Sequence, residues 1–133
     1  MPTKVIVDAN FLMLPPKFRI DIFRELSRTL NRLVDVIVLS PVYEELHSIS
    51  LNEHPKLSKQ AEMALKIIEK LEIVDIKPNL GETVDNLIIR IAKEWNCPVA
   101  TNDSELRKKL RTIDIPVIYL RQGVRLEIDG KRS

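Results

Sequence analysis

The sequence has few of the residues that build disulfide-rich or membrane-spanning proteins. It contains one cysteine in 133 residues, which excludes a disulfide framework and a multi-cysteine zinc site within this chain. No apolar run reaches the ~18 residues that a membrane helix needs. The stretch from Met1 to Val7 leads directly into a strand-like pattern, unlike a signal peptide. These features predict a cytoplasmic protein with no membrane association.

Glycine, histidine and aromatic residues are also scarce. The three glycines form no GxGxxG or P-loop motif, so nothing supports binding of a nucleotide cofactor. His47 and His54 are not spaced with acids as a zinc site or a general-base set, and we expect both at the surface or in local structural roles. Cys97 precedes a proline and an apolar run, which favours a buried structural thiol.

The composition is sufficient for one folded unit. Hydrophobic residues make up 44% of the chain, so residues 1–133 can form a single domain with its own core. The formal net charge is only +2, but basic residues gather from residue 107 onward. They are Arg107, Lys108, Lys109, Arg111, Arg121, Arg125, Lys131 and Arg132. This segment is either a surface for nucleic acid or an ordinary solvated tail.

Short apolar runs alternate with amphipathic stretches along the chain. Strands are predicted at Lys4–Asp8, Val36–Leu39, Ile73–Ile76, Pro98–Thr101 and Pro116–Leu120, and Val124–Ile128 either pairs with the last strand or extends as a tail. Helices are predicted at Ile20–Leu33, from Ser40 to about Ser50 with Ser40 as the capping residue, at Leu57–Leu71, Val84–Trp95 and Ser104–Arg111. We therefore predict an α/β fold, a three-layer α/β/α arrangement with a mostly parallel central sheet of about five strands.

Two acidic residues follow the first two strands. Asp8 ends the first strand, although Asp-x-Asn is also ordinary turn chemistry. Glu45 lies at the edge of the apolar face of its helix at ~100° per residue, whereas Glu44 points to the opposite side. A carboxylate bordering an apolar face is costly without a partner, so Glu45 is a candidate site residue. The alternative for Glu45 is a favourable charge near a helix N-terminus.

Two further acids occupy equivalent positions in the second half of the chain. Asp85 lies in the first turn of its helix and borders the buried stripe, while Glu82 projects from the solvent side. Stabilisation by the helix dipole alone would also explain Asp85. Asp103 ends the fourth strand, where Asn102 can cap the next helix with Glu105 completing a capping box, and a capping acid at Asp103 needs no metal.

The joint placement of these acids is more informative than any one of them. Asp8, Glu45, Asp85 and Asp103 all fall at strand carboxyl ends or in the first helical turn beyond, and such positions converge on one edge of the sheet. Carboxylates in one cleft repel one another unless a cation neutralises them. Oxygen ligands without histidine or cysteine suit Mg²⁺ or Mn²⁺, and a water bound there can attack a phosphodiester.

The stretches around these acids resemble the PIN-domain nucleases. They are Val5–Asn10 (VIVDAN), Pro41–Leu46 (PVYEEL), Glu82–Ile88 (ETVDNLI) and Val99–Asp103 (VATND), and they span almost the whole chain in the family's order. The stretch from Asp8 to Leu26 is similar to an archaeal branch that resembles both VapC-type toxin ribonucleases and nucleases that process small-subunit ribosomal RNA.

The resemblance implies a role for each matching residue. Asp8, Glu45, Asp85 and Asp103 correspond to the family's four acids, and the implied chemistry is metal-dependent hydrolysis of RNA that leaves a 5′-phosphate and a 3′-hydroxyl. Asn10 would support Asp8 by hydrogen bonding, and Thr101 would orient a metal ligand or water. The implied partners are RNA and either an antitoxin or a pre-ribosome, and the apolar faces permit a homodimer.

The RNA-contacting residues are predicted from charge and position alone. Lys17 and Arg19 follow the first acidic strand, and Arg107, Lys108 and Arg111 lie on the helix after Asp103. Phosphate contacts there would give salt-dependent binding without sequence specificity. The alternative is a solvated helix face. Trp95 lies on a core stripe, which favours packing over base stacking.

Two other functions compete with the ribonuclease. The basic C-terminal segment also suits an RNA-binding or ribosome-assembly module with little cleavage of its own. A phosphatase-like hydrolase would use Asp8 as a nucleophile, but it usually needs a second acid two residues later, where this chain has Asn10.

Overall fold

The computed structural model describes residues 2–14, 21–123 and 125–130. Six strands form one sheet with the order β3-β2-β1-β4-β5-β6. All neighbouring strands are parallel except β5 and β6, which pair antiparallel. The strands are β1 (Thr3–Val7), β2 (Val34–Leu39), β3 (Glu72–Val74), β4 (Val99–Ala100), β5 (Val117–Arg121) and β6 (Arg125–Asp129). The predicted mostly parallel α/β sheet is confirmed, with β6 as an additional sixth strand.

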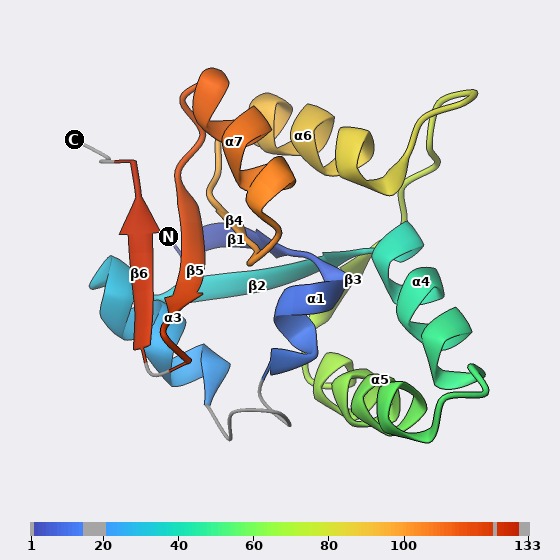
Figure 1. The fold of residues 1–133 in the computed structure, drawn as a ribbon. Helices are drawn as coiled ribbons and strands as arrows, with labels where there is room; N and C mark the ends of the chain where they lie inside the picture. The colour runs from blue at the N-terminus through green and yellow to red at the C-terminus, as the bar shows by residue number, and fades with distance from the viewer. Residues whose placement is uncertain (1, 15–20, 124, 131–133) are drawn as a thin grey trace.

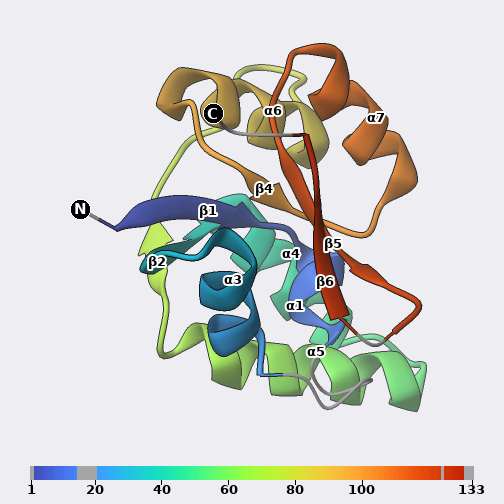
Figure 2. The ribbon, with the colours of Figure 1, turned by 90° about the vertical axis from the view of Figure 1, so that its left-hand side faces the viewer.

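Helices cover both faces of the sheet, as the predicted three-layer arrangement requires. The described helices are α1 (Ala9–Leu12), α3 (Ile22–Leu30), α4 (Ser40–Ser50), α5 (Pro55–Ile68), α6 (Val84–Trp95) and α7 (Ser104–Thr112). In both Figure 1 and Figure 2, α6 and α7 lie on one side of the sheet and α3 and α5 on the other. The core between these layers is built from fully buried aliphatic side chains, among them Ile6, Ile37, Leu46, Ile88 and Leu110.

The order of the strands along the chain reverses at the centre of the sheet, between β1 and β4. From β1 the chain moves outward through β2 to β3, and it then returns to the other side of β1 to form β4 and β5. The connections that leave β1 and β4 therefore go to opposite faces of the sheet (Figure 1). Ligands of open α/β sheets bind outside the carboxyl ends of the strands at such a reversal. Asp8 follows β1, and residues 101–103 follow β4 at this point.

Several local predictions need correction. Ser40 does not cap α4, because Leu39 is the N-cap residue and its side chain makes no capping bond. The Ser40 hydroxyl instead donates to the carbonyl of Ile76 at 3.1 Å and accepts from the Ile76 amide at 3.0 Å. It thus ties the start of α4 to the segment after β3, a tertiary contact that the capping pattern of the sequence does not reveal.

The boundaries of two helices also differ from the prediction. The helix predicted from Ile20 to Leu33 ends at Leu30, because Asn31 adopts the left-handed conformation with φ of 52° and closes the helix. Leu33 is consequently 76% exposed rather than buried. The helix predicted at Leu57–Leu71 begins at Pro55 and ends at Ile68. By contrast, α6 has the predicted bounds, and Thr83 caps it by accepting a hydrogen bond from the Asn86 amide.

Two findings concern the lengths of the described helices and the place of the cysteine. None of the helices in the described residues is long and apolar enough to cross a bilayer. Cys97 is buried as predicted, with 4% of the residue exposed. Trp95 packs against the core, and the ammonium of Lys4 lies 4.8 Å from the centroid of its ring.

Candidate active site

Asp8 is a buried carboxylate at the end of β1. The residue is 7% exposed, and it is the N-cap of the one-turn helix α1. Its Oδ1 atom accepts a hydrogen bond from the Phe11 amide at 2.9 Å, and its Oδ2 atom accepts one from the Thr101 hydroxyl. Burial raises the pKa of Asp8 to about 7 from 3.8, although both hydrogen bonds oppose the rise. The charges of Asp85 and Asp103 raise this pKa further.

Thr101 links the first acid to the fourth. It is fully buried at the end of β4, and its hydroxyl oxygen accepts a hydrogen bond from the Asp103 amide at 3.0 Å while it donates to Asp8. Thr101 therefore holds the two segments that follow β1 and β4 in one arrangement. Its expected role in orienting a metal ligand or water stays a prediction.

Asp103 caps α7. Its Oδ1 atom accepts from the amides of Glu105 at 2.9 Å and Leu106 at 3.3 Å. The alternative in which Asn102 caps this helix is wrong. The Asn102 carboxamide instead bonds both backbone groups of Leu120, with its Oδ1 accepting at 2.8 Å and its nitrogen donating at 3.1 Å. In the hydrogen bonds of the described residues, the second oxygen of Asp103 accepts none, so it remains for a ligand.

Asp85 comes from the first turn of α6, as expected, whereas Glu45 comes from the second turn of α4 because that helix already begins at Ser40. Partial burial raises the pKa of Glu45, and repulsion from Asp85 raises it further. Burial likewise raises the pKa of Asp85, and the carboxylate of Asp103 adds to the rise. The nearby ammonium of Lys109 opposes it. These mutual effects show that the carboxylates lie within electrostatic reach of one another.

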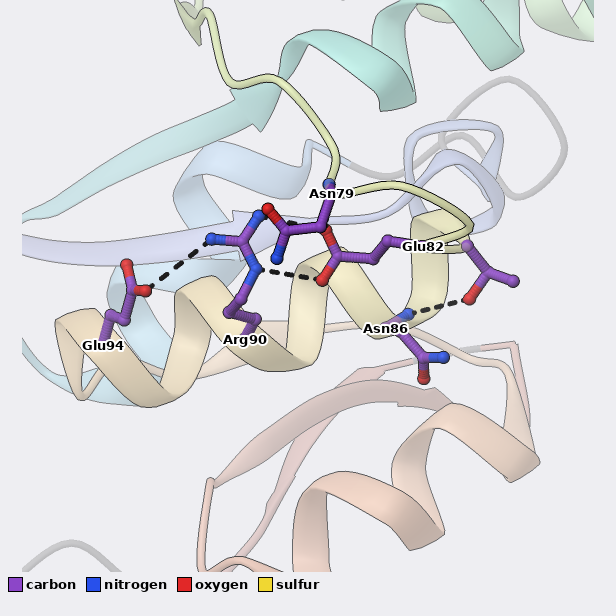
Figure 3. A network of polar contacts seen from close by, with 6 residues as sticks. Asn79, Glu82, Asn86, Arg90 and Glu94 are labelled. Carbon is purple, nitrogen blue, oxygen red and sulfur yellow. Dashed lines mark hydrogen bonds and ion pairs between the residues drawn. The ribbon is translucent and has the colours of Figure 1, made fainter.

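A polar network fixes the segment that leads into α6. Figure 3 shows the guanidinium of Arg90 between the carboxylates of Glu82 and Glu94. Arg90 donates to both oxygens of Glu82, at 2.9 and 3.0 Å, and Oε1 of Glu82 also accepts from the Asn79 amide at 3.0 Å. The Glu82 side chain is 11% exposed, so the expectation that it projects into solvent is wrong. The turn before Asp85 is therefore anchored to the body of its own helix.

All four acids line one cavity. It measures about 230 Å³ and is lined by residues of α1, α4 and α6 and by the N-cap residues of α1 and α7. Its lining residues are Asp8, Ala9, Asn10, Met13, Glu45, Ile49, Val84, Asp85, Ile88 and Asp103. The structure thus brings together four carboxylates from separate segments, with apolar side chains such as Ile49 and Ile88 behind them. Their roles in catalysis and metal binding stay predictions.

The residues present fit a hard divalent cation with a hydrated coordination sphere. The cavity offers carboxylate oxygens without a histidine or cysteine, which suits Mg²⁺ or Mn²⁺ better than zinc. The carboxylates line the cavity without closing on one point, since no three acidic, histidine or cysteine side chains in the described ranges are placed to hold an ion together. Mg²⁺ usually keeps several waters and uses one or two carboxylates together with substrate phosphates. The open arrangement is consistent with that kind of site.

The expected support of Asp8 by Asn10 takes a different form. Asn10 is exposed and lines the cavity, and its Oδ1 atom accepts a hydrogen bond from the Asn102 amide at 3.3 Å. The carboxylate of Asp8 is held by Thr101 and Phe11 instead. The Asn10 side chain therefore joins the segment after β1 to the backbone of the segment after β4.

Two of the predicted RNA-contacting arginines are held in the fold. Arg107 donates to Oδ2 of Asp129 at 2.9 Å, and its guanidinium lies 3.7 Å from the centroid of the Tyr119 ring. Arg111 lies 3.6 Å from Oδ1 of Asp129 and donates to the carbonyl of Ile115 at 3.3 Å. Both side chains thus join α7 to the β5–β6 hairpin, and their contact with RNA stays a prediction.

The other predicted contacts have a different status. Lys108 is exposed on α7, and its contact with RNA stays a prediction. Lys17 and Arg19 lie outside the described residues. The basic residue that affects the acidic cavity is Lys109, which was not among the predicted site residues. Its spacing of four from Glu105 puts both on one flank of α7, but the sequence does not show which flank faces the acids.

The comparisons with known proteins agree with this fold. A family profile described as a PIN-like domain matches residues 5–123. Ribonuclease VapC4 of Methanocaldococcus jannaschii is 36% identical over 130 residues, which are 96% of this chain and 97% of that protein. The rRNA-processing protein utp23 of Schizosaccharomyces pombe is 28% identical over 127 residues, and the match covers 92% of this chain but only 47% of the yeast protein.

A solved structure gives the same result in three dimensions. The PIN domain endonuclease Utp24 superposes with a TM-score of 0.80 and 26% sequence identity. The match covers 98% of this chain and 93% of the Utp24 chain. The similarity therefore includes the strands and helices that carry all four acids.

Proposed function

This chain belongs to the family of PIN-like domains, and from that premise we propose that it is a divalent-metal-dependent endoribonuclease. The observation that carries the proposal is the single cavity lined by Asp8, Glu45, Asp85 and Asp103. The relatives support the same activity, because one is a ribonuclease and another is an endonuclease. The proposed reaction is hydrolysis of an RNA phosphodiester that leaves a 5′-phosphate and a 3′-hydroxyl.

The four acids are the proposed holders of Mg²⁺ or Mn²⁺. When bound, such an ion supplies a water activated for attack on the phosphodiester and neutralises the charge that develops on phosphate oxygens. The contribution of the protein's own residues is to keep the carboxylates in place. Thr101 orients Asp8, the capping bonds orient Asp103, and the Arg90–Glu82 pair anchors the turn before Asp85. Ile49 and Ile88 add apolar side chains to the lining of the cavity.

The geometry disfavours the two competing functions. The phosphatase-like alternative lacks a second acid two residues after Asp8, where Asn10 accepts a hydrogen bond from the Asn102 amide. The hypothesis of an RNA-binding module without cleavage is based on the basic C-terminal segment. Arg107 and Arg111 of that segment are engaged with Asp129, which weakens the observation behind that alternative.

The relatives suggest two biological settings for the same chemistry. Ribonuclease VapC4 favours a toxin-type ribonuclease with an antitoxin as partner, and the rRNA-processing protein utp23 favours RNA maturation with a pre-ribosome as partner. A homodimer is a further proposal, consistent with exposed apolar side chains such as Leu51 and Met63. A small protein encoded immediately beside this one would support the toxin, and isolation from such a neighbour would support maturation.

The test of the proposed function is RNA cleavage by matched pairs of variants. Purified protein is incubated with single-stranded and with structured RNA in Mn²⁺, in Mg²⁺ or in chelator, and the product ends are identified. We expect cleavage in metal only, and a loss on the order of 100-fold or more for Asp8→Asn. Glu45→Gln and its neighbour Glu44→Gln form the sharpest pair, because only Glu45 lines the cavity. Equal activity in wild type and Asp8→Asn would contradict the proposal.

A further inference from the structure

Helix α7 has two flanks with different surroundings. At ~100° per residue, the buried Leu106 and Leu110 define the direction of the core. Arg107 and Arg111 lie on one side of that direction, and Glu105 and Lys109 lie on the other, each pair roughly 80–120° from it. Residues four apart lie on the same face of a helix, so the two residues of each pair have the same surroundings.

The flank with the arginines is occupied by the C-terminal hairpin. Asp129 of β6 bonds Arg107 and lies within ion-pair distance of Arg111, and the ring of Tyr119 lies under the Arg107 guanidinium. Gly130 lies against the guanidinium of Arg111, and its φ of 99° is a conformation that residues with a side chain rarely adopt. One carboxylate therefore contacts both guanidinium groups, which ties this flank of α7 to the hairpin.

The flank with Glu105 and Lys109 faces the start of α6. The charges of both residues act on the carboxylate of Asp85, with Lys109 lowering its pKa and Glu105 raising it. Lys109 is exposed, and in the described ranges none of the ion pairs includes it. Figure 1 shows α7 next to α6, on the side of the sheet opposite α5. Lys109 therefore lies on the flank of α7 opposite the hairpin, on a helix that begins at the cavity-lining Asp103 and packs against α6.

An acidic cavity repels the polyanion that it is proposed to cut. A positive group beside the cavity lowers the cost of bringing a second phosphate close to it. A lysine suits this position, because its ammonium is a compact charge on a flexible stem that reaches a phosphate from a range of backbone positions. Such a contact places the RNA chain and carries no base preference.

We propose that Lys109 binds a backbone phosphate of the RNA next to the phosphodiester in the acidic cavity and so positions the strand for cleavage. This inference rests on the proposed function, since it names a substrate contact of the same site. Lys109 acts on the RNA directly and takes no part in bond breaking. The inference replaces Arg107 and Arg111 as the phosphate contacts of α7.

The experiment measures RNA binding and cleavage separately. Binding of a short single-stranded RNA is followed by fluorescence anisotropy over a range of KCl concentrations, with Asp8→Asn in every protein to prevent cleavage. Lys109→Ala is compared with Lys109→Arg, which keeps the charge. The matched control is Lys59→Ala, which removes an exposed lysine from α5 on the far side of the sheet. Cleavage is then measured for the same lysine variants with Asp8 intact.

We expect Lys109→Ala to weaken binding about 3- to 10-fold and to reduce the slope of log affinity against log salt by about 0.7, the effect of losing one phosphate contact on a single strand. Lys109→Arg should retain most of the affinity and the slope. Lys59→Ala should match the parent protein in both. In the cleavage assay, Lys109→Ala should raise KM more than it lowers kcat.

The outcomes distinguish this inference from the proposed function. If Lys109→Ala and Lys59→Ala have the same affinity and salt slope, the inference is wrong even when cleavage depends on Asp8. If the slope depends on Lys109 but wild type cleaves no RNA in metal, the phosphate contact stands and the nuclease proposal fails. No RNA binding by any of the proteins would overturn the inference.

Discussion

The hydroxyl of Thr101 donates a hydrogen bond to the carboxylate of Asp8, 93 positions away in the sequence. Both residues are buried, and the same hydroxyl accepts a hydrogen bond from the Asp103 amide. One side chain therefore joins the ends of β1 and β4, the two strands between which the sheet reverses its direction of growth. The position of two proposed metal-binding acids depends on this contact.

Removing the Thr101 hydroxyl should damage both activity and stability. Thr101→Val keeps the shape of the side chain but leaves Asp8 with one hydrogen bond and the Asp103 amide without its acceptor. We expect cleavage to fall about 10- to 100-fold, as for partners of metal ligands. The free energy of unfolding in urea should fall by about 1–3 kcal/mol, because buried polar groups lose their partners. Thr101→Ser keeps the hydroxyl and is the control, and equal behaviour of the two variants would contradict the assigned role.

The buried carboxylate of Asp8 should make the metal-free protein less stable as the pH rises. The pKa of Asp8 is raised from 3.8 in the unfolded chain to about 7 in the fold, chiefly by burial. Below about pH 4 the group is protonated in both states and costs nothing. Between pH 4 and 7 the unfolded state loses its proton first, so folding stability decreases through this window and the loss is complete above the folded pKa.

Asp8→Asn tests this dependence, because a neutral amide pays no cost for a buried charge. In chelator at pH 8 the variant should melt at least roughly 3 °C above wild type, and the difference should shrink towards pH 5. Thermal unfolding by circular dichroism across pH 5–8 measures it. Glu44→Gln, an exposed neighbour of the site, is the control and should follow wild type. An unchanged difference between pH 5 and pH 8 would show that the charge of Asp8 is not the cause.

The contact between Arg107 and Asp129 should be structural. Its ion pair is about one-third exposed at each side chain, so we expect a coupling of about 0.5–1 kcal/mol in a double-mutant cycle of Arg107→Ala and Asp129→Ala. Urea unfolding of the four proteins gives this value. Arg107→Ala should leave the salt slope of RNA binding unchanged. A decrease in that slope, without coupling to Asp129, would restore Arg107 as a phosphate contact.

The Arg90–Glu82 pair should control the order of the turn before α6. Arg90→Met keeps the aliphatic stem and removes the two hydrogen bonds to Glu82. We expect faster hydrogen exchange of the Asn79 amide, which donates to Glu82, and a several-fold lower kcat because Asp85 follows this turn. Exchange measured by mass spectrometry should be unchanged in α3, the internal control. Unaltered exchange at Asn79 would show that the pair does not order the turn.

The convergence of the four acids was predictable from the sequence because it follows from topology. Buried strands that alternate with helices imply a parallel sheet, and the carboxyl ends of such strands meet at one edge. The helical positions of Glu45 and Asp85 relative to their apolar stripes also indicated that both face the interior of the site. Both residues line the cavity in the structure.

Contacts between distant segments were not predictable. Arg107 and Arg111 form an exposed basic face in the sequence pattern, and only the antiparallel pairing of β6 brings Asp129 to them. Lys108 and Lys109 cannot be distinguished in the sequence pattern. Only the packing of α7 against its neighbours decides which of the two lysines faces the acids. One-turn helices are also invisible to periodicity, so the sequence predicts no element at α1, the helix that Asp8 caps.

The central claim is that the carboxylates from separate segments share a divalent ion, and calorimetric titration of Mn²⁺ into metal-free protein tests it most directly. At pH 8 we expect wild type to bind Mn²⁺, and Asp8→Asn and Asp85→Asn each to bind it at least about 10-fold more weakly. Asp75→Asn, which removes an exposed acid away from the cavity lining, should bind like wild type. Equal Mn²⁺ affinity in wild type, Asp8→Asn and Asp85→Asn would contradict the account.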